Sequence, residues 1–197
     1  MENNTISYYN NHAADFVNNT ATVDIKVIQD RFLKYIPEQE NILDFGCGSG
    51  RDSKYFLEKG YKVTATDGSK ELCALASNIA GIEVKCMLFS ELDEIEVYNG
   101  IWACSSILHL TKTELKDVFF KMYRALKDEG YIYTSFKYGN FEGWRGDRYF
   151  TDFTENEFKK FLEEIPGIEI QEMWITADVR PDRGAEKWLN MILKKSE

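Results

Sequence analysis

Three glycines spaced two residues apart, at positions 46, 48 and 50, follow the short apolar run 41–45. Glycine lets the backbone turn sharply and lets a ligand approach where a Cβ atom would otherwise stand. About twenty residues further on, Asp67 closes a second apolar run, where its carboxylate can accept hydrogen bonds from both hydroxyls of a ribose. These residues predict a nucleoside-binding site.

The residues around this glycine loop argue against a ligand that carries phosphates. The dinucleotide fingerprint has its third glycine three residues after the second, and here that position holds Arg51. Asp44 lies two residues before the first glycine, where a negative charge repels a pyrophosphate and attracts an ammonium group. The Gly-Lys-Ser/Thr signature of a P-loop is also missing from the sequence. A zwitterionic nucleoside without phosphates fits these residues better.

S-adenosylmethionine (SAM) answers that description, and the motifs resemble the class I SAM-dependent methyltransferase family. The family's first motif stands here as residues 44–50 and its second-strand acid as Asp67, and segments 87–92 and 100–110 resemble its adenine pocket and its fourth strand. The resemblance covers roughly residues 38–136 and implies methyl transfer from SAM, with S-adenosyl-L-homocysteine (SAH) as the product. It also implies an α/β fold: a doubly wound, seven-stranded, mostly parallel sheet with an antiparallel last strand and helices on both faces. The stretch from Trp102 to His109 is similar to small bacterial methyltransferases of the tellurite-resistance type.

The resemblance places the cofactor against the glycine loop, the second-strand acid, the segment after the third strand and the end of the fourth strand. The predicted cofactor-binding residues are Asp44, Gly46, Cys47, Gly48, Ser49, Gly50, Arg51, Asp67, Gly68, Ser69, Met87, Leu88, Phe89, Ala103, Cys104 and Ser105. The apolar residues at 87–89 are explained equally well as core, because an adenine pocket and a core both need such side chains. The cysteine at 47 fits better as a small packed residue than as a reactive thiol.

His109 is the candidate catalytic base, because histidine titrates near neutral pH and can accept a proton from an incoming nucleophile. Its apolar neighbours, Leu108 and Leu110, favour the alternative of a partly buried histidine with a structural hydrogen bond. Methyl transfer also does not require a dedicated base, because the sulfonium already activates the methyl group.

The predicted substrate pocket follows the fifth strand, in residues 135–150, where aromatic side chains alternate with cations. Tyr138, Arg145 and Arg148 are the candidate substrate residues, and Arg180 and Arg183 in a later loop are expected to face the same pocket. Arginine binds oxyanions with two parallel hydrogen bonds, so a small anionic substrate is expected. The alternative is a solvated loop with ordinary surface charges.

Residues 1–36 precede the sheet and are expected to form an N-terminal helical lid or extension on a single methyltransferase domain, 37–197. Apolar residues recur at helical spacing between Ile25 and Ile36, which predicts a helix packed on the sheet. Tyr8, Tyr9 and Phe16 are predicted to close the site over the cofactor and exclude water. An ordinary surface helix is the alternative.

Strands and helices are expected to alternate along the chain, which indicates a parallel sheet covered by helices. The predicted strands are 41–45, 61–66, 82–86, 100–104, 130–136, 168–176 and 187–194, and the predicted helices are 51–59, 69–80, 113–127 and 154–165. Capping boxes at Thr111–Glu114 and Thr154–Glu157 mark the starts of the last two helices.

The composition narrows the class of protein further. The 197 residues carry a formal net charge of -9, which disfavours sequence-independent binding to nucleic acid. Four cysteines without a Cys-x-x-Cys pair and two histidines indicate neither a disulfide framework nor a metal site. No leader or membrane segment is evident, so a cytoplasmic monomer or homodimer acting on a small molecule is expected. The alternatives are a noncatalytic SAM-binding module and, less well supported, an NAD-linked oxidoreductase.

Overall fold

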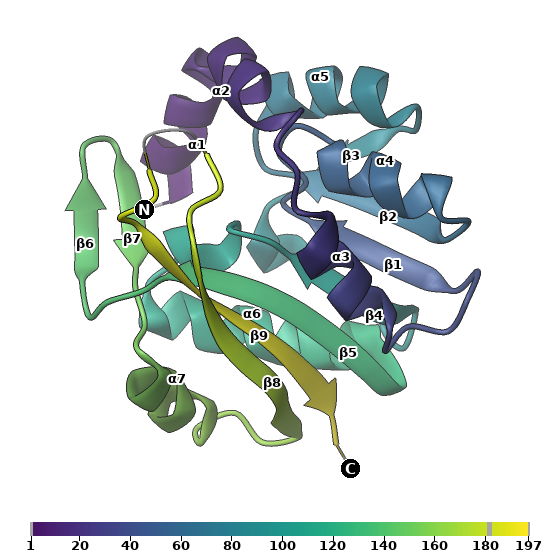
Figure 1. The fold of residues 1–197 in the computed structure, drawn as a ribbon, viewed down its shortest axis with the longest axis vertical. Helices are drawn as coiled ribbons and strands as arrows, with labels where there is room; N and C mark the ends of the chain where they lie inside the picture. Colours follow the sequence, from purple (N-terminus) through teal and green to yellow (C-terminus); the bar gives the residue numbers. More distant parts are fainter. Residues whose placement is uncertain (1, 181–182, 197) are drawn as a thin grey trace.

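One central sheet organises the molecule (Figure 1). The computed structural model describes residues 2–180 and 183–196. The strands of the central sheet are β1 (Asn41–Phe45), β2 (Lys62–Asp67), β3 (Val84–Cys86), β4 (Tyr98–Ala103), β5 (Leu126–Lys137), β8 (Ile168–Ala177) and β9 (Lys187–Lys195). Their order across the sheet is β3-β2-β1-β4-β5-β9-β8. The predicted seven-stranded α/β fold is confirmed.

The last strand, β9, runs against the rest of the sheet. Neighbouring strands from β3 to β5 pair in parallel, whereas β9 is antiparallel to both of its neighbours, β5 and β8. The start of β9, with Trp188, therefore lies at the edge of the sheet that is formed by the carboxyl ends of the other strands. This edge is where open α/β sheets bind their ligands.

Alternating residues of the strands pack against helices on the two faces of the sheet. Ile42 faces α3 (Lys26–Leu33) and α4 (Arg51–Glu58), where it packs with Phe32 and Phe56. The next residue, Leu43, faces α6 (Lys112–Ala125) and α7 (Glu155–Leu162), where it joins a core that includes Phe119. α5 (Lys70–Ala80) packs over β2 and β3. Both faces of the parallel strands are buried, as parallel sheets require.

The capping boxes begin their helices as predicted. The Thr111 side chain accepts a hydrogen bond from the Glu114 amide at 3.2 Å, and Glu114 in turn accepts one from the Thr111 amide at 2.8 Å. Thr154 and Glu157 form the same reciprocal pair at the start of α7. α6 ends two residues earlier than predicted because the chain turns into β5 at residue 126.

A β-hairpin stands where the sequence predicts only a loop after the fifth strand. Its strands are β6 (Glu142–Arg145) and β7 (Arg148–Thr151), joined by a turn in which Gly146 has a φ of +59°. Trp144 and Tyr149 lie opposite each other across the pair, with ring centroids 5.5 Å apart. Their edge-to-face contact belongs to the cross-strand pairs that stabilise sheets.

Two short helices, α1 (Glu2–Asn11) and α2 (Ala13–Thr20), lie at the ligand-binding edge of the sheet between the hairpin and α5 (Figure 1). The predicted N-terminal helix at 25–36 is α3, which ends at Leu33. No helix within residues 2–180 and 183–196 is long and apolar enough to cross a membrane.

Candidate functional site

A cavity of about 410 Å³ opens at the ligand-binding edge of the sheet. It extends from the glycine loop after β1, past the ends of β4 and β5, to the start of β9. Eighteen of the residues predicted to form or face the site line it: Gly46, Cys47, Gly48, Ser49, Arg51, Asp67, Gly68, Leu88, Phe89, Cys104, Ser105, His109, Tyr9, Phe16, Arg145, Arg148, Arg180 and Arg183. The structure therefore gathers residues from both ends of the sequence around one space.

Seven predicted residues, all within the described ranges, lie outside this lining: Asp44, Gly50, Ser69, Met87, Ala103, Tyr8 and Tyr138. Gly50 begins α4, and a Cβ atom there would stand 2.8 Å from the carbonyl oxygen of Ala76. The hydroxyl of Ser69 caps α5 by accepting a hydrogen bond from the Leu72 amide at 3.2 Å. Gly50 and Ser69 thus shape the walls without facing the cavity.

The other five residues of that group turn toward the core, the N-terminal helices or the protein surface. Ala103 is fully buried, and Met87 packs against the main hydrophobic core. The ring of Tyr8 stacks on His12 with centroids 4.3 Å apart, and the Tyr138 hydroxyl donates to a carboxylate of α7. Asp44, the fifth, is buried and accepts a hydrogen bond from the Ser53 hydroxyl instead of facing the cavity.

Asp67 and the glycine loop form one hydrogen-bonded unit. The amides of Gly46 and Cys47 donate to the carbonyl oxygen of Thr66 at 2.9 and 2.8 Å, which ties the loop to β2. Asp67 accepts one hydrogen bond on each carboxylate oxygen, from the Gly48 amide at 2.9 Å and the Ser69 amide at 2.8 Å. Because a carboxylate has about four lone-pair positions, two remain for a ligand. The free acceptors fit the two hydroxyls of a ribose.

Two of the glycines bring other parts of the chain close to the loop. Gly48 has a φ of +56°, and a Cβ atom there would stand 2.9 Å from the ring of Phe16 in α2. Gly46 has a φ of +82°, and its Cβ atom would stand 2.5 Å from the Cβ of Ser106. Any larger residue would combine backbone strain with a clash.

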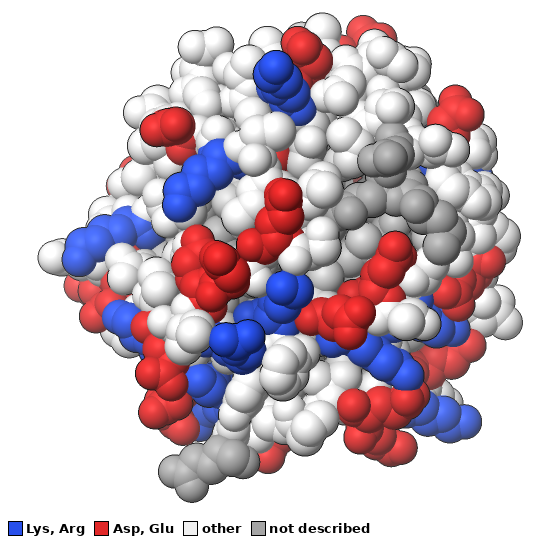
Figure 2. Space-filling view, turned by 180° about the vertical axis from the view of Figure 1, so that it is seen from behind, with Lys and Arg blue, Asp and Glu red and all other residues white. Residues whose placement is uncertain are grey.

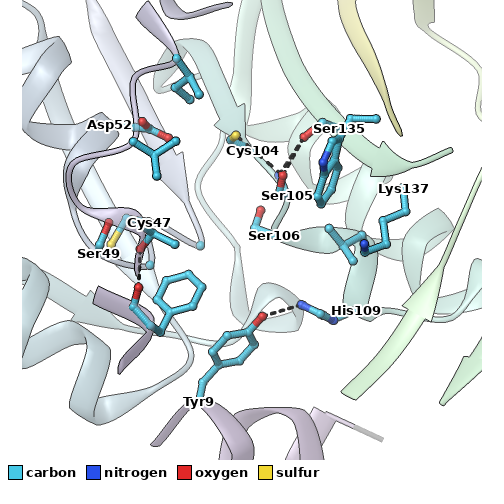
Figure 3. Close-up of a pocket in the computed structure, with 18 of the residues that line it drawn as sticks. Tyr9, Cys47, Ser49, Asp52, Cys104, Ser105, Ser106, His109, Ser135 and Lys137 are labelled. Atoms are coloured by element: carbon cyan, nitrogen blue, oxygen red, sulfur yellow. Dashed lines mark hydrogen bonds between the residues drawn. The ribbon is translucent and has the colours of Figure 1, made fainter. Parts of the chain in front are cut away.

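Asp52, the first-turn acid of α4, is a cavity residue that the sequence analysis missed. It accepts hydrogen bonds from Gln29 at 2.8 Å, from the indole of Trp102 at 2.9 Å, and from Arg51 at 2.7 and 3.0 Å. Figure 3 places it beside the glycine loop. The signal was its position directly after Arg51, because an arginine that is largely removed from water needs a carboxylate partner.

His109 and Tyr9 point toward each other at the foot of the cavity (Figure 3). The Tyr9 hydroxyl lies 2.8 Å from Nε2 of His109, and Nδ1 of His109 lies 2.6 Å from the carbonyl oxygen of Tyr149. A carbonyl only accepts, so Nδ1 carries the proton and Nε2 accepts from Tyr9. Burial, assisted by the nearby charge of Arg148, lowers the pKa of His109 to about 4. The ring is therefore neutral at pH 7, with both nitrogens engaged.

Ser105 occupies a strained position at the end of β4. Its φ is +52°, in the left-handed region that side chains other than glycine rarely adopt. Its amide donates to the Ser135 hydroxyl at 2.9 Å, and the two hydroxyls lie 3.2 Å apart (Figure 3). Strain of this kind concentrates at functional sites.

Most of the cations around the cavity already have a carboxylate partner. Arg145 donates to Asp152 at 2.8 Å, and Arg180 donates to Asp178 at 2.9 Å. Arg148 differs, because among the residues the structure describes no carboxylate lies within 4 Å of its guanidinium. The structure therefore places the cations expected from the sequence around one cavity, and it adds which of them are paired.

Trp188 and Asn190 of β9 also line the cavity and were not predicted. The Asn190 side chain accepts a hydrogen bond from the Tyr133 hydroxyl at 2.8 Å and donates to Thr176 at 3.1 Å. The available signal was an amide inside an otherwise apolar strand, because a buried polar group needs partners.

In the part of the chain that the structure describes, no group of three or more His, Cys, Asp or Glu side chains is arranged to hold a metal ion. The groups that remain to bind a ligand are the carboxylate of Asp67, the backbone of the glycine loop and the side chains of the cavity wall.

Comparison with known proteins relates this chain to a protein family. The profile of the family described as "Methyltransferase domain" matches residues 42–130, from β1 to the early part of β5. A Bacillus subtilis protein with a methyltransferase name, YqeM, is 32% identical over 123 residues, which cover 55% of this chain and 50% of YqeM. The chain thus spans about half the length of this curated relative.

Solved structures share the whole fold. The 1,6-didemethyltoxoflavin-N1-methyltransferase of Burkholderia thailandensis, with 1,6-didemethyltoxoflavin and SAH bound, superposes with a TM-score of 0.78 at 23% identity over 100% of this chain and 89% of the other. A TehB-like SAM-dependent methyltransferase of Corynebacterium glutamicum gives 0.68 at 20% identity over 96% and 99%. Residues 42–130 therefore match the methyltransferase domain family, and the chain as a whole shares the fold of SAM-dependent methyltransferases.

Proposed function

We propose that this protein transfers a methyl group from SAM to a small-molecule acceptor. The observation that carries the proposal is the continuity of the cavity, which joins the Asp67–glycine loop unit to the polar ends of β4, β5 and β9. A cofactor over β1 and β2 and an acceptor over β5 and β9 would meet near Ser105.

The residues present fit SAM. The two free acceptor positions of Asp67 suit the ribose hydroxyls, and Leu88 and Phe89 supply apolar walls for the adenine. When bound, SAM supplies a methyl group on a positively charged sulfur, so that a bond from the acceptor to the methyl carbon forms while the sulfur–carbon bond breaks and SAH is left.

The protein's own part is to position the reactants and to exclude water. Holding two reactants in line can lower a barrier by about 7 to 11 kcal/mol in favourable cases. His109 does not serve as a base at neutral pH in this proposal, because its Nε2 is already occupied by Tyr9 and its pKa is low. It acts instead as a positioning residue that holds Tyr9 in the cavity wall.

We propose that α1 and α2 form the lid predicted for residues 1–36, over a methyltransferase domain of residues 37–197. Phe16 lies against Gly48 of the glycine loop. Ile6 lies against Gly68, where an added Cβ atom would stand 2.6 Å from Cδ1 of Ile6. Two lid side chains thus cover the positions where the cofactor would lie. Their apolar surfaces support a role in keeping water from the sulfonium.

A small acceptor and a cytoplasmic location belong to the same proposal. Acidic and basic side chains are interspersed on the face shown in Figure 2, which suits a small acceptor better than a nucleic acid. The neighbouring Burkholderia enzyme holds a small molecule beside SAH. The four free cysteines fit a reducing compartment. A closer relation to the tellurite-resistance type, and a monomeric or homodimeric state, stay predictions.

Ligand-dependent stability tests this proposal. We expect SAH at a hundredfold excess over its dissociation constant to raise the unfolding free energy by about 2.7 kcal/mol, and NAD to have no effect. Calorimetric or urea unfolding with each ligand measures this. The absence of stabilisation by SAH would contradict the proposed cofactor. Transfer of label from methyl-labelled SAM into a metabolite extract then separates an enzyme from a noncatalytic SAM-binding module, which binds SAH without transferring label.

A further inference from the structure

The half of the cavity farthest from Asp67 carries an excess of positive charge. In the described parts of the chain, five cationic side chains line this half, and three carboxylates pair with them. The cations are Lys137, Arg145, Arg148, Arg180 and Arg183. The whole protein has a formal net charge of -9, so the positive charge in this half of the cavity is opposite in sign to the net charge of the protein.

Pairing removes most of these cations from the set available to a ligand. Arg145 is held by Asp152 and Arg180 by Asp178, while Lys137 and Arg183 share Glu186. The pairs of Arg145 and Arg180 are neutralised, and Glu186 offsets one of the two charges of Lys137 and Arg183, so a ligand gains less from approaching these four cations than from an unpaired one. Arg148 remains as the cation whose charge faces the cavity without a carboxylate from the described residues.

Aromatic rings hold the guanidinium of Arg148 in place. Its central carbon lies 4.6 Å from the ring centroid of Tyr8 and 5.2 Å from that of Phe150. One of its nitrogens donates to the Tyr9 hydroxyl at 3.3 Å, a long hydrogen bond to a neutral group. A guanidinium stacked in this way keeps further N–H groups free, and their fork matches the two oxygens of a carboxylate.

The surroundings of Arg148 are flat and aromatic. Tyr9, Phe150 and Trp188 line the same half of the cavity. Aromatic walls favour planar ligands, because flat rings stack with large contact area and little loss of conformational freedom.

We propose that the acceptor is a small planar acid, with a carboxylate bound by Arg148 and its ring against these aromatic side chains. This inference rests on the proposed function, because it assigns the acceptor to the methyl-transfer site. The carboxylate is the anchor, and the methylated atom lies elsewhere on the acceptor, nearer Ser105.

Matched probes test the anchor directly. With the protein saturated by SAH, binding of benzoate, benzamide and cyclohexanecarboxylate is measured by ligand-observed NMR. We expect benzoate to bind roughly tenfold more tightly than its neutral isostere benzamide, since a hydrogen bond to a charged group is worth more than a neutral one. We also expect benzoate to bind more tightly than cyclohexanecarboxylate, which has the charge without the flat ring.

Variants at one position assign the preference to Arg148. In Arg148→Gln the preference for benzoate over benzamide should disappear, whereas Arg148→Lys should keep part of it. Arg124→Gln, which removes one exposed positive charge on α6, is the matched control and should behave as wild type. Unchanged SAH affinity in each variant shows that the fold and the cofactor half are intact.

The outcomes separate this inference from the proposed function. Failure of the wild type to bind SAH contradicts the proposed function itself. Normal SAH binding, with equal affinity for benzoate and benzamide or with an anion preference that survives in Arg148→Gln, overturns the anchor and leaves the methyltransferase proposal standing. A metabolite extract split on an anion exchanger gives a second readout with methyl-labelled SAM. Acceptor activity should lie in the retained fraction, and activity in the flow-through alone would also overturn the inference.

Discussion

Asp44 illustrates how a residue in a family motif can be buried by its neighbours. Its carboxylate lies under the glycine loop and accepts a hydrogen bond from Ser53 at 2.5 Å. Burial, followed by the charge of nearby Asp52, raises the pKa of Asp44 to about 8. Because Asp44 is buried and does not line the cavity, it has no direct contact with a ligand ammonium, contrary to the expectation from the sequence. The sequence showed Asp44 as part of the glycine motif, but it did not show that the Ser53 hydroxyl of α4 would donate a hydrogen bond to it.

The raised pKa of Asp44 predicts how stability depends on pH. The native state keeps a proton on Asp44 that the unfolded state releases above pH 4, so this residue makes the protein less stable as the pH rises toward 8. His109 has the opposite effect only between about pH 4 and 6.5, because its native pKa is lowered. Between pH 6.5 and 8 we therefore expect the unfolding free energy of the ligand-free protein to fall by about 1 to 2 kcal/mol.

Urea unfolding across that pH range measures the slope. Asp44→Asn keeps an acceptor for Ser53 and should flatten it. Asp93→Asn, at an exposed position, is the control and should leave the slope unchanged. A slope that persists in Asp44→Asn would show that another group titrates there.

The hairpin β6–β7 joins helix α1 to the segment between β4 and α6. The Thr151 hydroxyl donates to the carbonyl oxygen of Leu110 at 2.6 Å, and the Tyr149 amide donates to the Thr5 hydroxyl of α1 at 3.3 Å. The hairpin also carries Arg148 and the carbonyl that orients His109. Sequence patterns missed it because its strands have only four residues each and their burial depends on distant partners.

The hairpin turn gives a prediction about stability. Gly146 has a φ of +59°, so Gly146→Ala should cost about 1 kcal/mol of unfolding free energy through backbone strain alone, since nothing lies within 4 Å of the added Cβ. Gly184→Ala is the control, because that glycine also has open space and lacks a positive φ. Urea denaturation compares the two. Equal stability of both variants would count against the turn geometry.

Helix α2, which we propose as part of the lid, gives a prediction about cofactor binding. Phe16 lies against Gly48 and lines the cavity, so Phe16→Ala should weaken SAH binding about tenfold by removing apolar contact area. Val27→Ala on α3, where the valine is 83% exposed, should leave SAH affinity unchanged. Titration calorimetry measures both. Wild-type affinity in Phe16→Ala would mean that α2 covers the site without contacting the cofactor.

At the scale of the whole molecule, the sheet could be predicted far more completely than the site. Hydrophobic runs and glycine spacing are local signals that located every strand of the central sheet, and the capping boxes at Thr111 and Thr154 located the starts of α6 and α7. The ion pairs of Arg145 and Arg180 and the contact of Tyr9 with His109 join residues far apart in the chain. Such pairs depend on how the elements pack, which short patterns in one sequence do not encode.

The sheet order predicts how the molecule opens. Among the described strands, β8 pairs only with β9, so the two should lose protection from hydrogen exchange together. Asn190→Ala leaves the Tyr133 hydroxyl without its acceptor and should speed exchange in both strands while β1 and β4 stay protected. Asn78→Ala, at an exposed position of α5, is the control. Protection of β8 while β9 exchanges would contradict this coupling.

The insertion of β9 between β5 and β8 has a consequence for synthesis on the ribosome. Translation proceeds from the N-terminus, so β1 to β5, with the glycine loop and Asp67, emerge before the strand that completes the acceptor wall. β8 then has to wait for β9, its partner among the described strands, before it can join the sheet. A nascent chain can therefore form the nucleoside half of the cavity while the half around Trp188 is still open. We expect chaperones to bind the nascent chain in this state, in which only the nucleoside half of the cavity has formed.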